Sequence, residues 1–190
     1  MSSGFPQQPD AADSGSLVQQ GDSPPIYRVP ASGPLCYSHP MNSAPGAVQI
    51  RPLSDLDLGR ITAIDERLTG VYKPDVWERR VVYYLRRDPE ACPVALIDGK
   101  VVGFIFTDLR SGEFGLEEIC GWIERFGVDP DYQGRSIGRR LFESAQAYLQ
   151  SQGATVLRTL VGPEDGDLAG FLRAVGFQNA PLQALEMKIS

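Results

Sequence analysis

The sequence comprises 190 residues, of which 42% are hydrophobic and 22% are charged. This composition suits one globular domain with a packed core plus an extension. The formal net charge of -6 argues against a general affinity for nucleic acid or anionic membrane, and no apolar run reaches membrane-spanning length. We therefore expect neither a nucleic-acid partner nor a membrane partner.

Cysteine and histidine usage narrows the chemistry further. Cys36, Cys92 and Cys120 are odd in number and lack metal-ligand spacing, which indicates buried or incidental thiols in a reducing, cytoplasmic compartment. His39 is the only histidine and lies in the N-terminal extension. The domain itself therefore excludes Ser-His pairs, Cys-His pairs and the common zinc sites. We expect no metal, and carboxylates, tyrosines, water and backbone amides remain to transfer protons.

Residues 1–47 form the extension. They are rich in Pro, Gly, Ser and Gln, contain one cation, Arg28, and show no apolar period, so we predict that they are disordered. They lack the basic start and apolar segment of a secretory signal. A partner-binding tail is the functional alternative, and Met41 is an alternative start of translation.

A strand and two helices are predicted next. Val48 to Leu53 alternates apolar and polar residues, as a strand does. Ser54 or its neighbour caps a helix that ends at Gly70, and a second helix begins at Pro74. The linker between the helices, residues 68–73, is either a substrate loop or an ordinary turn.

The centre of the chain predicts three strands. Asp98 and Gly99 lie between apolar runs at residues 93–97 and 101–107. An Asp-Gly pair between such runs is a strong hairpin signal, because the tight turn needs positive φ. A further strand runs from Ile119 to Val128.

The C-terminal part predicts a strand, a helix and a last strand. The strand runs from Thr155 to Val161, and the helix carries apolar residues from Leu168 to Val175 and ends near Gly176. In the last strand, residues 185–189, apolar residues alternate with polar ones.

The loop from Val128 to Arg140, VDPDYQGRSIGRR, joins a strand to a helix, because apolar residues recur at helical spacing from Ile137 onward. Gly134 and Gly138 remove the Cβ atoms that would keep a ligand off the backbone. Unpaired amides at the helix start can then surround an anion. This geometry suits a pyrophosphate.

Three arginines lie at or beside the first turn of that helix: Arg135, Arg139 and Arg140. The helix dipole disfavours cations there by a few tenths of a kcal/mol or more, so a bound anion would offset them. The alternative is a solvated basic face at the helix start.

This loop resembles the acyl-CoA signature of the GNAT N-acetyltransferase superfamily, which is Gln or Arg, two residues, Gly, one residue, then Gly or Ala. The residues that fill it here are Gln133, Gly134, Arg135, Ser136, Ile137 and Gly138. Ser136 stands where the family usually has glycine. A serine at a helix start can adopt helical φ and ψ and offer its hydroxyl to a phosphate.

The order of predicted elements also resembles GNAT proteins, and the resemblance spans residues 48–190. It implies an α/β (α+β) fold with a mixed central sheet of six to seven strands and about four helices. It also implies that the strands at residues 119–128 and 155–161 are parallel and splay apart to admit acyl-CoA.

The resemblance further implies acetyl-CoA as cosubstrate and a primary amine, of a small molecule or a protein, as acceptor. Pantetheine would pair with backbone groups at Phe126, Gly127 and Val128. The amide of Val128 would polarise the thioester carbonyl, a contribution of about 2–4 kcal/mol to the barrier.

Glu124 is the first candidate for the base that removes the amine proton. It lies four residues before Val128, so strand alternation places both on one face, with Trp122, if no bulge intervenes. The next candidates are Glu117, Glu118 and Glu113. A solvated or ion-paired glutamate is the alternative for Glu124.

The leaving-group acid is where the chain departs from the family. Many members have a tyrosine where this chain has Leu172 and a preceding asparagine where it has Asp165; we assign both positions to the CoA site by resemblance. Leu172 cannot donate a proton. Either solvent protonates the thiolate or another hydroxyl, such as that of Tyr132, does so.

Two functional classes follow. The favoured one is an acetyl-CoA-dependent N-acetyltransferase, and the other is a catalytically weak acyl-CoA-binding regulatory module, which Ser136 and Leu172 suggest. The acceptor's identity and the acyl chain length stay open, as does the choice between a monomer and a homodimer.

Overall fold

The structure, a computed structural model, describes residues 46–189. The predicted disordered extension, residues 1–47, lies almost entirely outside the described residues, as do Cys36 and His39. Cys92 and Cys120 are free, buried thiols.

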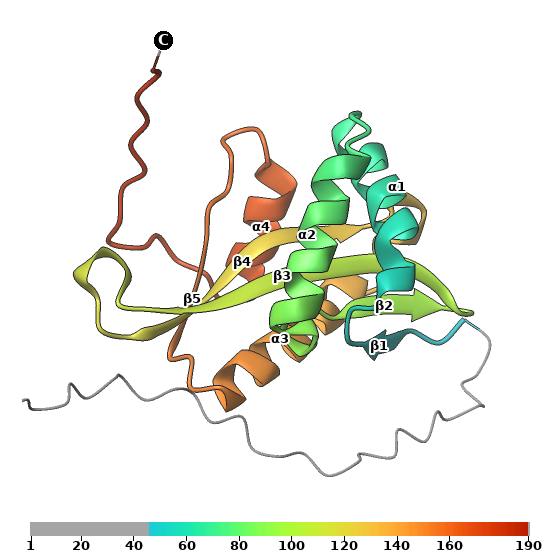
Figure 1. The fold of residues 1–190 in the computed structure, drawn as a ribbon, viewed down its shortest axis with the longest axis horizontal. Coiled ribbons are helices and arrows are strands. Elements are labelled where there is room, and N and C mark those ends of the chain that lie inside the picture. Colours follow the sequence, from blue (N-terminus) through green and yellow to red (C-terminus); the bar gives the residue numbers. More distant parts are fainter. Residues whose placement is uncertain (1–45, 190) are drawn as a thin grey trace, which may run out of the picture. The chain divides into compact units, whose positions relative to one another are not determined.

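A five-stranded mixed sheet forms the centre of the described domain (Figure 1). The strands follow one another in chain order across the sheet, and all neighbours are antiparallel except the last pair, which is parallel. The strands are β1 Gln49–Arg51, β2 Val94–Ile97, β3 Lys100–Ser111, β4 Ile119–Val128 and β5 Val156–Thr159.

Helices cover both faces of this sheet. Their bounds are α1 Leu58–Thr69, α2 Pro74–Arg87, α3 Ile137–Ser151 and α4 Gly166–Ala174, with short 3-10 helices η1 Asp55–Asp57, η2 Pro89–Ala91, η3 Glu113–Gly115 and η4 Pro130–Tyr132. α1 and α2 pack on one face and α3 on the other (Figure 1). None of the helices in residues 46–189 combines the length and apolarity that a membrane span needs.

Successive side chains of β3 point to opposite faces of the sheet and so belong to two separate apolar clusters. Phe104 and Phe106 lie with Trp77 of α2 in the cluster under α1 and α2. Ile105 faces the opposite way and packs with Leu141 in the cluster under α3. Both faces of the sheet are therefore buried, and the layers follow one another as helix, sheet and helix, an arrangement common to α/β folds.

The helix ends and the hairpin turn that the sequence predicts are present. Gly70 ends α1 in the left-handed region, at φ 72°, and Pro74 opens α2. Asp98 and Gly99 both have positive φ, 48° and 76°, and join β2 to β3 as the expected hairpin. These predictions are confirmed.

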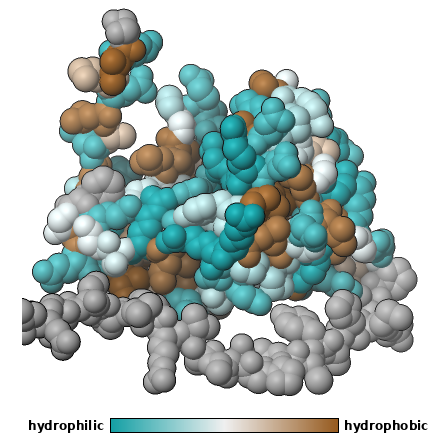
Figure 2. Space-filling model, viewed as in Figure 1, coloured by the Kyte–Doolittle hydropathy of each residue, from teal (hydrophilic) through white to brown (hydrophobic). Residues whose placement is uncertain are grey.

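The predicted last strand is not formed. Residues 177–189 contain no helix or strand, and the side chains of Leu185, Met187 and Ile189 are 87%, 80% and 88% exposed. Figure 2 shows hydrophobic side chains along this segment, at upper left, alternating with hydrophilic ones. An alternating pattern makes a strand only where a sheet edge pairs with it. The described sheet accordingly has five strands rather than six to seven.

Candidate active site

β4 and β5 separate part-way along their length. They pair in parallel from Cys120 with Val156 to Ile123 with Thr159, and the Thr159 hydroxyl donates to the Ile123 carbonyl at 2.9 Å. β5 ends there, whereas β4 continues to Val128 paired with β3. The predicted splay of the parallel pair is thus present.

Backbone polar groups of β4 face this splay. The amide of Asp129 donates to the carbonyl of Val102 across the β3–β4 ladder at 2.8 Å. Because bonded and non-bonded positions alternate along antiparallel strands, the N–H and C=O groups of Phe126 and Val128 turn toward the splay. Those of Gly127 turn toward β3. The expected backbone contact of pantetheine with Gly127 therefore does not suit this ladder, whereas contacts with its two neighbours do.

Side-chain packing explains two glycines that we assigned to CoA binding. A Cβ on Gly127 would lie 2.9 Å from Cδ1 of Leu68 and from Cζ of Phe104. A Cβ on Gly138 would lie 3.0 Å from Cζ of Phe126. The missing Cβ of Gly138 therefore makes room for a phenyl ring of β4, and any role in admitting a ligand comes in addition.

The loop between β4 and α3 contains two left-handed residues, Gly134 at φ 75° and Ser136 at φ 58°. The expectation that Ser136 adopts ordinary helical angles is wrong, and its side chain forms no capping hydrogen bond. A left-handed conformation costs a residue with a Cβ about 1–2 kcal/mol. This backbone requirement explains why glycine suits the position.

Asp129 anchors the start of the loop to α1. Its carboxylate is 1% exposed and accepts from Arg60 Nη2 at 3.0 Å and from Arg67. Gln133 Nε2 donates to the carbonyl of Val128 at 3.1 Å. No local pattern around Asp129 predicts this contact. The sequence signal for it is a pair of arginines, Arg60 and Arg67, which are seven residues apart and hence on one side of a helix.

The arginines at the helix start are exposed. The guanidinium of Arg135 lies 5.4 Å from the ring centroid of Tyr132, and Arg139 Nη1 lies 3.9 Å from Glu143 Oε1. Arg140 is also exposed. Exposed and weakly paired guanidinium groups fit an anion-binding loop, and they equally fit a solvated basic face.

β4 contains a bulge at Glu124. Successive β3 residues Phe106 and Thr107 pair with the residues on either side of Glu124, which itself has no Cα partner. The expectation that Glu124 and Val128 share a face is wrong, because the extra residue reverses the alternation. Val128 packs in the cluster under α3, whereas Glu124 lies against α2.

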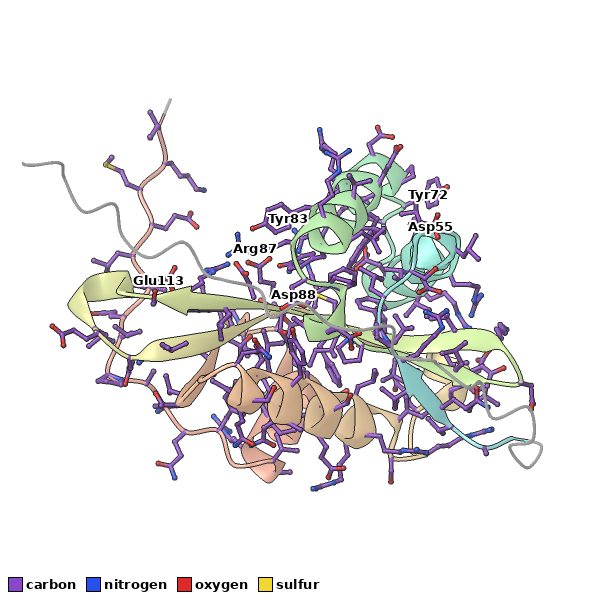
Figure 3. All side chains as sticks on the ribbon, turned by 60° about the horizontal axis from the view of Figure 1, so that its bottom comes forward. Asp55, Tyr72, Tyr83, Arg87, Asp88 and Glu113 are labelled. Carbon is purple, nitrogen blue, oxygen red and sulfur yellow. The ribbon has the colours of Figure 1, made fainter. Side chains whose placement is uncertain are left out.

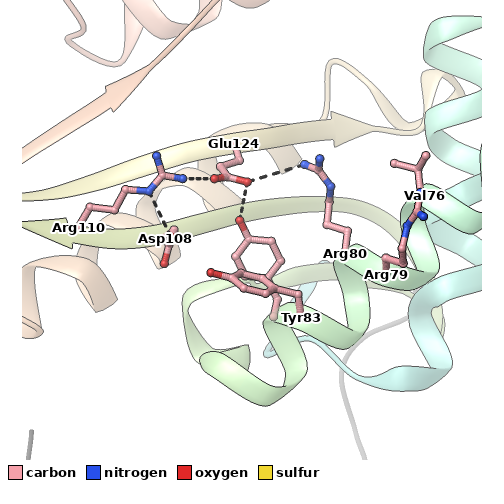
Figure 4. A pocket seen from close by; sticks show the side chains of 8 residues that line it. Val76, Arg79, Arg80, Tyr83, Asp108, Arg110 and Glu124 are labelled. Carbon is pink, nitrogen blue, oxygen red and sulfur yellow. Dashed lines mark hydrogen bonds and ion pairs between the residues drawn. The ribbon is translucent and has the colours of Figure 1, made fainter. Parts of the chain in front are cut away.

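Three groups contact the Glu124 carboxylate (Figure 4). The Tyr84 hydroxyl donates to Oε2 at 2.7 Å, Arg110 pairs with Oε1, and Arg80 Nη1 lies 3.8 Å from Oε2. Burial and the hydrogen bond to Glu124 raise the pKa of Tyr84 well above its usual value, so this hydroxyl keeps its proton. The Glu124 side chain is 29% exposed and stays accessible to solvent.

These residues line a pocket between α2 and strands β3 and β4. Its volume is about 380 Å³, and its lining comprises Val76, Arg79, Arg80, Tyr83, Tyr84, Asp108, Arg110 and Glu124. Trp122 lies on the same side, as expected, with the Arg110 guanidinium 5.4 Å from its ring centroid.

The next candidate bases lie elsewhere. Glu113 Oε1 is 3.5 Å from Arg110 Nη1, Glu118 pairs with Arg158, and Glu117 is exposed. None of them lines the pocket beside Glu124. Within residues 46–189, no group of three or more His, Cys, Asp or Glu side chains is arranged to hold a metal ion.

Comparison with known proteins decides the family. Residues 60–177 match the model of the acetyltransferase (GNAT) family, which is more than half of the chain. The chain belongs to the GNAT family.

Curated relatives of this GNAT chain include several acetyltransferases. An uncharacterized N-acetyltransferase of Methanocaldococcus jannaschii is 32% identical over 109 residues, 56% of this chain and 48% of the relative. A mycothiol acetyltransferase of Thermobifida fusca is 32% identical over 95 residues, which are 48% of this chain and 29% of the relative. An aminoglycoside N(6')-acetyltransferase of Stenotrophomonas maltophilia is 32% identical over 83 residues, which are 43% of this chain and 54% of the relative. The chain thus spans about half, or less, of the length of the curated relatives it matches.

Solved structures share the fold. The aminoglycoside N-acetyltransferase AAC(6')-Iy in complex with CoA superposes with a TM-score of 0.67 at 19% identity, over 78% of this chain and 99% of that chain. Ard1 from Thermoplasma volcanium superposes with a TM-score of 0.60 at 23% identity, over 70% of this chain and 83% of that chain. The mixed sheet with its splayed parallel pair is therefore the GNAT fold.

Leu172 of α4 and Asp165, which directly precedes α4, are the positions where this GNAT protein departs from the family pattern. Leu172 is buried, at 5% exposure, and Asp165 is exposed at the start of α4, without a side-chain capping bond. The neighbouring ring of Phe171 stacks on Phe126, with centroids 5.2 Å apart and planes 10° apart. α4 thus presents an aromatic ring, and no hydroxyl, to β4 here.

Proposed function

We propose that this GNAT protein transfers an acetyl group from acetyl-CoA to a primary amine of a small molecule or a protein. The observation that carries the proposal is the splay itself. β4 leaves β5 after Ile123 and turns the backbone groups of Phe126 and Val128 into the gap, directly before an exposed, arginine-rich helix start.

The chain offers groups that fit acyl-CoA along this path. The amides of Phe126 and Val128 and the carbonyl of Phe126 suit the amide-bearing pantetheine arm, because they lie along a strand edge. The carbonyl of Val128 already accepts from Gln133. The loop residues Gln133 to Arg139 suit the pyrophosphate, since helix-start amides and exposed guanidinium groups both bind anions. Arg135 and Arg139 are the groups we assign to the phosphates.

The reaction follows from this placement. The neutral amine attacks the acetyl carbonyl and forms the C–N bond, the C–S bond breaks, and CoA leaves as a thiolate. The N–H of Val128 donates to the oxygen that becomes negative, worth about 2–4 kcal/mol of barrier. Since Leu172 has no proton to give, solvent or the Tyr132 hydroxyl protonates the thiolate.

Glu124 takes the amine proton in this proposal. Its carboxylate already accepts from Tyr84 and Arg110 and lies 3.8 Å from Arg80 Nη1. Two carboxylate oxygens offer about four acceptor sites, so an amine or a relaying water has room. The pocket that Glu124 lines gives the acceptor access.

The test is release of free CoA from acetyl-CoA in the presence of a panel of primary amines, for wild type and for Glu124→Gln. We expect Glu124→Gln to lower turnover by about 10²–10⁴-fold while the CoA dissociation constant stays unchanged. Glu113→Gln is the matched comparison, because Glu113 pairs with the same Arg110 from outside the pocket. A larger loss in Glu113→Gln would move the base there.

The regulatory module is the second candidate, and the apolar, buried Leu172 favours it. For primary amines with a pKa of about 10, turnover by an enzyme should rise with pH toward that value, because only the neutral amine attacks. Tight CoA binding without turnover for every amine at high pH would establish the module instead.

A further inference from the structure

α2 carries a local positive charge in an acidic chain. The formal net charge of the whole chain is -6. Within its 14 residues, however, α2 contains four arginines and two acidic residues. The arginines are Arg79, Arg80, Arg86 and Arg87.

This charge lies at the acceptor pocket. Arg79 and Arg80 line the pocket beside Glu124. A second hollow of about 380 Å³ is lined by Arg79, Val82, Tyr83, Arg86 and Arg87. Both hollows have Arg79 and Tyr83 in their linings, and the second is lined by residues of α2 alone.

The arginines differ in how far carboxylates neutralise them. Arg110 pairs with Asp108 at 3.2 Å and also with Glu124, and Arg87 Nε lies 2.9 Å from Asp108 Oδ1. Arg79 and Arg86, by contrast, form no ion pair with any residue in the described range 46–189, and both are exposed. Seven residues apart, they lie on one side of α2.

An aromatic side chain lies between these two arginines. Tyr83 is 48% exposed, and the Arg87 guanidinium lies 5.8 Å from its ring centroid (Figure 3). Tyr83 also packs edge-on against Tyr84, which holds Glu124. A planar ring flanked by guanidinium groups provides an apolar surface for a ligand and charged donors at its rim.

We propose that the acceptor is an amine that also carries an anionic group, a carboxylate or a phosphate, which Arg79 and Arg86 bind while the amine lies at Glu124. This inference rests on the proposed acetyl transfer. The guanidinium fork matches both anions with two parallel hydrogen bonds. The same charges repel a polycationic acceptor, so the subsite selects against such amines.

The experiment compares amines that differ in the anionic group alone. Phenethylamine is paired with 4-(2-aminoethyl)benzoate, and tyramine with tyramine phosphate, so the two pairs distinguish carboxylate from phosphate. We expect kcat/KM to favour the anionic member of at least one pair by about 10-fold or more, as charge-assisted hydrogen bonds allow. Added salt should narrow the preference.

Arg79→Gln should abolish most of this preference. Arg173→Gln is the matched control, because it removes the same charge from an exposed position on α4 and should leave the preference intact. Calorimetric binding of the same amines to the CoA-bound protein measures the subsite without turnover.

The outcomes separate the two proposals. Equal kcat/KM and equal affinity within both pairs, unchanged in Arg79→Gln, would overturn the anionic acceptor and leave acetyl transfer standing. Arg79-dependent binding of the anionic amines without any release of CoA would support the subsite and contradict the proposed acetyl transfer.

Discussion

Ser136 carries a backbone cost that no side-chain capping bond offsets. Its φ of 58° is left-handed, and its side chain forms no capping hydrogen bond. Serine there pays about 1–2 kcal/mol that glycine does not, although glycine loses part of that advantage to the entropy of the unfolded chain. The choice of residue at this position of the acyl-CoA signature should therefore affect the free energy of unfolding of the domain.

We expect Ser136→Gly to raise the melting temperature by about 2–4 °C, which corresponds to about 1 kcal/mol for a domain of this size. Ser151→Gly is the matched control, since Ser151 closes α3 with helical geometry and its hydroxyl donates to the Tyr148 carbonyl. Glycine should lower the melting temperature there. If CoA affinity falls in Ser136→Gly at unchanged stability, the serine hydroxyl binds a phosphate, and relief of strain is not the dominant effect.

At the scale of elements, α3 packs against β4 where a glycine of the helix contacts a phenyl ring of the strand. Gly138 leaves room for Phe126, whose ring stacks on Phe171 of α4. A substitution at Gly138 therefore displaces a side chain of the strand that faces the splay. Loss of CoA binding in such a variant would not by itself demonstrate contact between Gly138 and CoA.

A double-mutant cycle separates the two effects. We expect Gly138→Val to lower the free energy of unfolding by about 1–3 kcal/mol, because the core around the ring becomes overpacked. In a Phe126→Ala background the same substitution should cost less than half as much, since the clashing ring is gone. Denaturant unfolding measures all four proteins. Equal costs in both backgrounds would show that the ring is not what Gly138 accommodates.

Elements governed by local chemistry could be predicted from the sequence. The Asp98–Gly99 hairpin and the glycine that ends α1 depend on positive φ, which few residues adopt, so the residue types reveal the geometry. The loop before α3 is likewise recognisable from its glycines and arginines.

Elements that depend on distant partners could not be predicted. The bulge at Glu124 arises from the pairing of β4 with β3, and one extra residue is enough to move its carboxylate to the α2 side. The buried pairing of Asp129 with α1 joins residues more than 60 positions apart. The segment at residues 185–189 has the pattern of a strand, but the described sheet offers it no pairing.

At the scale of the whole molecule, the core is built from residues well inside the chain. The two apolar clusters draw on residues from Val48 to Phe177, and the family match covers residues 60–177. The extension before residue 48 has too little apolar content to offset the entropy of ordering it. We infer that the fold and the CoA site do not require residues 1–40.

A variant that starts at Met41 should therefore match the full chain in melting temperature and CoA affinity. A second variant that starts at Leu53 provides the contrast, because it lacks β1 and the Arg51 guanidinium that pairs at 2.6 Å with Asp57, whose carboxylate is 2% exposed. Leaving that buried carboxylate without its arginine should lower the melting temperature clearly. If the first truncation alone lowers it by many degrees, the extension packs on the domain and is part of the fold.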